Sequence, residues 1–180
     1  MYTKGYTCII DHSYFLNRCF ESDLIAVSKA SFVTEFEFKV SVSDFRADLK
    51  KWAVVHPKGY SRGKRFSEIY SDEVKHKHDM VASGDFGLKF FYFVAPKGVI
   101  PIAELPEHTG LIEMHRTTGR VIVEYTRKAP TLPKAERLTA LQKDIIFDKL
   151  KHRYLKMRQG ELCAAIEEFE KGENRKASTR

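Results

Sequence analysis

Three charged side chains could perform chemistry together, because they lie on segments that otherwise favour buried strands: Asp23, Glu37 and Lys39. Two carboxylates can hold a magnesium ion, which keeps most of its waters and also binds phosphate oxygens. Such an ion lowers the pKa of a bound water and neutralises developing charge. A lysine beside it can orient or deprotonate that water. These residue types therefore suggest phosphodiester hydrolysis, with Mg²⁺ or Mn²⁺ as the cofactor.

The residues around this trio predict an antiparallel β-hairpin that would bring it together. Residues 24–28 favour a short buried strand and residues 29–31 a turn. Residues 32–40 then alternate with period two and are rich in aromatic and β-branched side chains. A three-residue turn pairs positions whose numbers sum to about 60, so that Asp23 lies opposite Glu37. Lys39, two residues further along, shares their face, whereas a slip of one residue would separate the two carboxylates.

A surface ion pair is the competing interpretation, since Glu-x-Lys on a strand is common in solvated sheets. The aspartate on the paired strand favours a metal site, and so does the helix expected to follow. Ser43 would cap that helix at Asp44. Its apolar face would carry Phe45, Leu49 and Trp52. On a sheet face otherwise bound for the core, two acids and a lysine cost free energy unless they are paired or bind a metal.

Two blocks of the sequence resemble the PD-(D/E)xK, or restriction-endonuclease-like, nuclease superfamily, and within it the branch of MmcB-like, DNA-repair-related proteins. The first block comprises ESDLIAV at 21–27 and TEFEFKVSVSDFRADLK at 34–50, where a strand with Glu-x-Lys runs into a helix with the pattern S-x-S-D-F-x-x-D. The second comprises FYFVAP at 91–96 and ELPEHTGLIEM at 104–114. Ser22 stands where the motif's name has proline. Asp11 and Glu21 are weak substitutes for the acidic residue that many members carry on their first helix.

The resemblance implies an α/β fold with a three-layer core, in which helices flank a mixed central β-sheet and further helices follow at the C-terminus. It also implies metal-dependent hydrolysis of DNA, in DNA repair or in phage DNA processing. By the family pattern, Asp23 and Glu37 would bind the metal and Lys39 would assist the attacking water. The carboxylates that could support this site are Glu21, Glu35 and Asp44. The alternative is a catalytically inactive accessory protein of the same fold that binds nucleic acid, and a third reading is a structural protein with a surface ion-pair cluster.

A basic insertion at residues 53–80 is expected to contact DNA phosphates. Its stretch HPKGYSRGKRF is rich in turn residues, and residues 66–80 favour a helix with a Lys-His-Lys-His run near its end. Interleaved aromatic residues could stack on bases. Zinc binding by the two histidines is disfavoured because no further ligands are suitably spaced. The residues predicted to bind nucleic acid are Arg62, Lys64, Arg65, Lys75, His76, Lys77 and His78.

The nuclease core is expected to span residues 1–134 and a helical extension residues 135–180. In the core, residues 88–95 favour a strand buried on both faces. Residues 110–115 and 119–125 favour a hairpin that turns at 117–119. In the extension, residues 138–157 and 162–169 favour two helices separated by Gly160, and the polar tail from Gly172 favours disorder.

Charge and composition bear on partners and compartment. The 180 residues carry a formal net charge of +7 and the pI is about 9.2, which favours DNA as a partner without specifying a sequence. The three cysteines form no CxxC pair, which indicates a reducing compartment: the cytoplasm, or the host-cell cytoplasm for a phage-encoded protein. The N-terminus lacks a signal-peptide pattern, and the longest apolar stretch, residues 90–95, is too short to span a membrane. The sequence is compatible with a homodimer and does not decide the oligomeric state.

Overall fold

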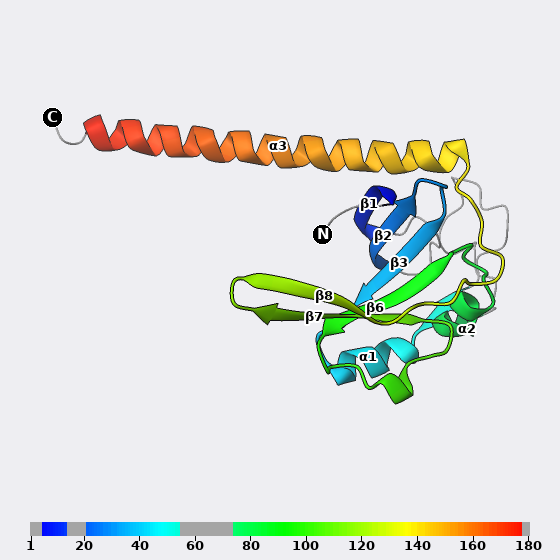
Figure 1. Ribbon diagram of the computed structural model, residues 1–180. Helices are drawn as coiled ribbons and strands as arrows, with labels where there is room; N and C mark the ends of the chain where they lie inside the picture. The colour runs from blue at the N-terminus through cyan, green and yellow to red at the C-terminus, as the bar shows by residue number, and fades with distance from the viewer. Residues whose placement is uncertain (1–4, 14–20, 55–73, 178–180) are drawn as a thin grey trace. The chain divides into compact units, whose positions relative to one another are not determined.

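The computed structural model describes residues 5–13, 21–54 and 74–177, and the chain divides into two units, Met1–Leu138 and Thr139–Arg180. Unit 1 is built on a mixed six-stranded sheet with the order β1-β2-β3-β6-β7-β8 (Figure 1). Strands β3, β6 and β7 are parallel, and the other neighbours are antiparallel. The strands are β1 (Tyr6–Ser13), β2 (Ser22–Ser28), β3 (Val33–Phe38), β6 (Phe90–Pro96), β7 (Gly110–Thr117) and β8 (Arg120–Arg127). The expected α/β class with a mixed sheet is confirmed.

One face of this sheet is apolar. Successive residues of a strand point to opposite sides, and the even-numbered residues of β2, β3, β6 and β7 form what we call the apolar face. On this face Phe36 and Tyr92 stack with ring centroids 5.7 Å apart. Its buried cluster consists of Ala26, Phe36, Tyr92, Val94, Ile112 and Ala129.

Two short helices, α1 (Val42–Leu49) and α2 (Lys77–Ala82), cover the opposite face. Phe45 of α1 meets Phe93 edge-on at 5.1 Å. His78 of α2 packs on Phe91 and Phe93, with 5.6 Å between ring centroids in each case. We call this the ionic face, because the odd-numbered residues of β3 place Glu35 and Glu37 on it. A small sheet of β4 (Trp52–Val54) and β5 (Val74–His76) precedes α2, and the 3-10 turn η2 (Ile102–Glu104) lies between β6 and β7.

The β2–β3 hairpin has the predicted register. Leu24 pairs with Phe36 and Val27 with Val33, so that paired positions sum to 60. The turn is closed by a hydrogen bond from the Ser28 amide to the Phe32 carbonyl at 2.9 Å. Asp23 and Glu37 are therefore the next opposed positions beyond the paired residues, and they share the ionic face.

The helix after β3 begins earlier than predicted. Its N-cap is Ser41 rather than Ser43, and the Ser41 hydroxyl accepts a hydrogen bond from the Asp44 amide at 3.1 Å. This bond satisfies one of the amides that have no partner in the first turn of a helix. Phe45 is buried as expected, but Trp52 does not belong to the helix: it starts β4 and is 60% exposed.

The helix predicted over residues 66–80 is wrong at residues 74–76 and confirmed at residues 77–80. Val74–His76 forms β5, which pairs with β4, and α2 begins only at Lys77. Contacts between paired strands favour a strand over a helix at this segment. The ring centroids of His76 and Trp52, for example, are 3.7 Å apart. Residues 66–73 lie outside the described residues, and so do Arg62, Lys64 and Arg65.

The strand predicted at 88–95 and the hairpin at 110–125 are both present, as β6 and as β7–β8. Unit 2 contains a single helix, α3 (Ala140–Ala177), so the break predicted at Gly160 is wrong. A glycine inside a helix costs only about 1 kcal/mol, and good helix formers flank this one. The tail from Gly172 is helical up to Ala177 in place of the predicted disorder. Within the described part of the chain, no helix combines the length and hydrophobicity needed to cross a membrane.

Candidate active site

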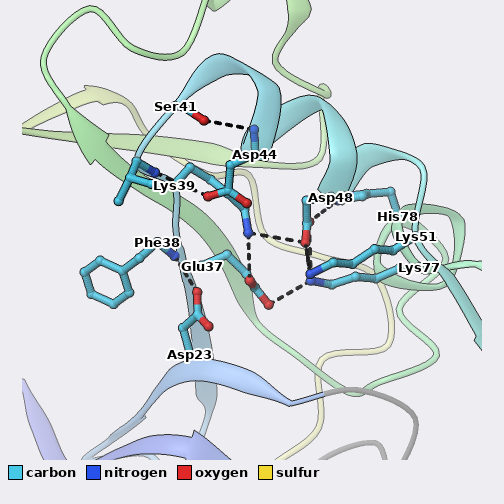
Figure 2. A network of polar contacts seen from close by, with 11 residues as sticks. Asp23, Glu37, Phe38, Lys39, Ser41, Asp44, Asp48, Lys51, Lys77 and His78 are labelled. Carbon is cyan, nitrogen blue, oxygen red and sulfur yellow. Dashed lines mark hydrogen bonds and ion pairs between the residues drawn. The ribbon is translucent and has the colours of Figure 1, made fainter.

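Asp23, Glu37 and Lys39 lie together at the end of the β2–β3 hairpin (Figure 2). Glu37 and Lys39 are buried, and the Lys39 Nζ is 3.2 Å from the Glu37 Oε2. The Asp23 Oδ2 accepts a hydrogen bond from the Phe38 amide at 2.8 Å, which holds this half-buried carboxylate beside the Glu-x-Lys segment. The trio that the sequence singles out therefore converges on one face.

The two carboxylates of this trio disfavour each other's charge. Burial raises the pKa of Asp23, and the negative charge of Glu37 raises it further. Burial alone would also raise the pKa of Glu37, but the ammonium groups of Lys77 and Lys39 outweigh it, and the pKa falls. A cation placed beside Asp23 would relieve the repulsion that remains.

A lysine that deprotonates water needs a lowered pKa, and Lys39 does not have one. Burial does act in that direction, but the carboxylates of Asp48 and Glu37 outweigh it and raise the pKa of Lys39. Its Nζ lies 3.3 Å from the Asp48 Oδ1. In this structure Lys39 is therefore an ammonium held by two carboxylates, not a lysine prepared to accept a proton.

Asp48, from α1, is the centre of the polar network and is fully buried. It contacts the ammonium of Lys51 at 2.7 Å and that of Lys39 at 3.3 Å. Its Oδ2 lies 3.0 Å from the His78 Nε2. Burial opposes its charge, yet His78 and the lysines together hold the pKa of Asp48 well below its usual range. The sequence pattern contained a signal for this role: Asp48 lies three residues after Phe45, so both side chains lie on the same side of the helix.

Lys77 and His78 are not on the nucleic-acid-binding surface that the sequence predicted. Both are buried because α2 begins at Lys77 and directs these side chains toward the sheet. The Lys77 Nζ is 2.7 Å from the Glu37 Oε1. The His78 Nδ1 is 3.2 Å from the His108 Nε2. Neither side chain is placed to reach a DNA backbone.

Lys75 and His76, the other described residues predicted to bind nucleic acid, differ in their exposure to solvent. Lys75 is exposed, and His76 is half-buried against Trp52.

The three carboxylates expected to support the site behave differently. Glu35 is completely buried on the ionic face, where it interacts with Ser22 and Glu37. Burial raises the pKa of Glu35 to about 8, although the Lys77 charge opposes the rise. Asp44 accepts a hydrogen bond from the Val40 amide at 3.3 Å, a role at the start of the helix. Glu21 is exposed just before β2.

The candidate site offers few donors for a divalent metal. The described residues contain no group of three or more His, Cys, Asp or Glu side chains arranged to hold a metal ion. Magnesium needs fewer protein ligands than such a group supplies, because it keeps several waters and is commonly bound by one or two carboxylates together with substrate phosphates. Asp23 and Glu37 offer two hard oxygen donors on one face, which fits such an ion. Binding would have to compete with the two ammonium groups on Glu37.

No protein-family model matches the chain, and no curated protein matches its sequence. Among solved structures, the SPO1766 protein of unknown function from Silicibacter pomeroyi is similar, with 14% sequence identity and a TM-score of 0.49. The similarity covers 87% of this chain and 80% of that chain. A likeness at this level supports no inference about activity.

Proposed function

We propose that this protein is a magnesium-dependent DNA nuclease with a restriction-endonuclease-like, three-layer core. The observation that carries the proposal is the convergence of Asp23, Glu37 and Lys39 at the end of one hairpin, on a face that is otherwise part of the core. The Glu-x-Lys strand lies beside the parallel strand β6 in the middle of a mixed sheet, which suits such a core.

In this proposal Asp23 and Glu37 hold the metal through their carboxylate oxygens. Bound magnesium would supply Lewis acidity and a water of lowered pKa for attack on phosphorus. Lys39 lies within reach of Glu37 and is fixed from the other side by Asp48. An ammonium fixed in this way can donate hydrogen bonds to a phosphate oxygen and stabilise the charge that develops there. The net charge of +7 favours a DNA backbone as the substrate.

The test is cleavage of DNA by the purified protein in Mg²⁺, compared with the Lys39→Ala variant. We expect the variant to lose activity by about 100-fold or more, with a circular dichroism spectrum like that of the wild type. Lys97→Ala is the matched control, because Lys97 is a half-exposed lysine that pairs with Glu124 on the β7–β8 side. Cleavage unchanged in Lys39→Ala would contradict the proposal.

A second candidate is a nucleic-acid-binding protein that keeps the fold without the chemistry. It is favoured by the fact that each oxygen of Glu37 already faces an ammonium group. These internal ion pairs neutralise the charge that a metal would need. This candidate predicts DNA binding that weakens steeply with salt, and no Mg²⁺-dependent turnover by the wild-type protein.

A further inference from the structure

Lys77 is the most enclosed cation of the network, with only 1% of its side chain exposed. Its Nζ lies 2.7 Å from the Glu37 Oε1 and 3.4 Å from each oxygen of Asp48 (Figure 2). A lysine is almost never buried to this extent unless it is paired. Here its pairing partners are two carboxylates that are themselves buried.

Glu35 adds a third acidic group on the same side. It precedes Glu37 by two residues and so shares the ionic face, and together with Glu37 and Asp48 it raises the pKa of Lys77 against the effect of burial. The Glu35 carboxyl interacts with Ser22 and Glu37, and burial raises its pKa to about 8.

Lys39 and Lys77 both bridge Glu37 and Asp48, but they lie on different oxygens of Glu37. Lys39 acts on Asp23 as well. Glu37 therefore lies between Asp23 on one side and Lys77 on the other, as Figure 2 shows. A cation bound by Asp23 and Glu37 would have the Lys77 ammonium as its neighbour across the Glu37 carboxylate.

We propose that the Lys77 ammonium takes the place of the second divalent cation found in two-metal phosphodiester sites, so that this protein binds one metal ion per chain. In a two-metal site both cations neutralise charge at the phosphate and share bridging ligands. Here a tethered ammonium already pairs with Asp48 and with the oxygen of Glu37 that Lys39 leaves free. The inference rests on the proposed function, because it concerns the metal that Asp23 and Glu37 would bind.

The test counts Mn²⁺ ions per chain by calorimetry and by electron paramagnetic resonance. We expect one bound ion in the wild type and two in Lys77→Ala, whose shortened side chain opens a cavity beside the Glu37 and Asp48 carboxylates. Two ions sharing Glu37 would also show spin coupling, which a single ion cannot. Lys51→Ala is the matched control: Lys51 contacts Asp48 at 2.7 Å but is 52% exposed, so its removal opens no enclosed cavity.

An unchanged number of ions in Lys77→Ala would overturn the inference. Wild-type protein that binds no Mn²⁺ would contradict both the proposed metal site and the count of one ion per chain, whereas one ion in both proteins would contradict the inference alone. Lys77→Ala removes one of the ammonium groups that compensate Glu37 and Asp48, and a variant that does not fold alone is measured with Mn²⁺ present. Recovery of its circular dichroism spectrum on addition of Mn²⁺ would then support the inference, and failure to recover at saturating Mn²⁺ would contradict it.

Discussion

The two faces of strands β3 and β6 are made of alternate residues of the same segments, yet their chemistry is opposite. On the apolar face, Phe36 stacks on Tyr92 in a cluster of buried hydrophobic residues. On the ionic face, Glu35 and Glu37 point from the same strand toward helices that bring Asp48 and Lys77. Both faces are buried to a similar degree. Burial alone therefore does not explain why one of them is charged.

The difference lies in what each face contributes to stability. Burying an aliphatic or aromatic side chain stabilises a fold by about 1.5–3 kcal/mol. A buried ion pair gains little or nothing, because desolvation offsets the attraction between the charges, and apolar replacements of whole pairs are often neutral or stabilising. The ionic face is thus a poor way to stabilise a sheet. This is the physical reason for regarding it as the functional side.

The largest effect on stability is expected from Lys77→Met, because it removes the cation shared by buried carboxylates while preserving the volume of the side chain. We expect a loss of about 3–5 kcal/mol in the free energy of unfolding, as for other buried pairs broken on one side. Ile112→Val on the apolar face should cost only about 0.5–1.5 kcal/mol. Urea denaturation measures the free energy of unfolding of both variants. Equal losses in the two variants would contradict the difference proposed between the ionic and the apolar face.

A smaller effect should come from His108, which joins the ionic network through His78. Burial and the neighbouring His78 ring lower the pKa of His108 to about 4 from its ordinary value of 6.5. Between these values the unfolded chain binds a proton that the folded chain does not. The contribution of His108 to stability is therefore present above pH 6.5 and is lost as the pH falls toward 4.

His108→Gln isolates this contribution. Allowing for partial exposure of the ring, we expect the stability advantage of the wild type over the variant to shrink by about 1–2 kcal/mol between pH 7 and pH 4. Urea denaturation at several pH values would measure it. A difference in stability that is independent of pH would show that the imidazole is not shielded as the structure indicates.

The parts of the molecule that local patterns determine could be predicted from the sequence. The β2–β3 register followed from alternation around a short turn, and it placed Asp23 opposite Glu37. The β7–β8 hairpin followed from the same kind of signal. Asp48 was within reach of such reasoning, because its spacing from Phe45 fixes its side of the helix.

The remainder of the site depends on long-range contacts that no local pattern encodes. Lys77 and His78 belong to a basic run that resembles a solvated segment, and only the pairing of β5 with β4 and the packing of α2 on the sheet turn them inward. His108 reaches His78 from the connection between β6 and β7. The error at Gly160 was of another kind: the helix-forming residues around it outweigh the small cost of one glycine.

The central claim is that Asp23 and Glu37 bind a divalent cation, and calorimetric titration with Mn²⁺ tests it most directly. Wild-type protein, Asp23→Asn and Glu124→Gln would be compared, the last altering a half-exposed carboxylate of β8 that pairs with Lys97. We predict binding to the wild type and to Glu124→Gln, and its loss in Asp23→Asn with the fold intact. No binding to the wild type, or equal binding to Asp23→Asn, would contradict the account.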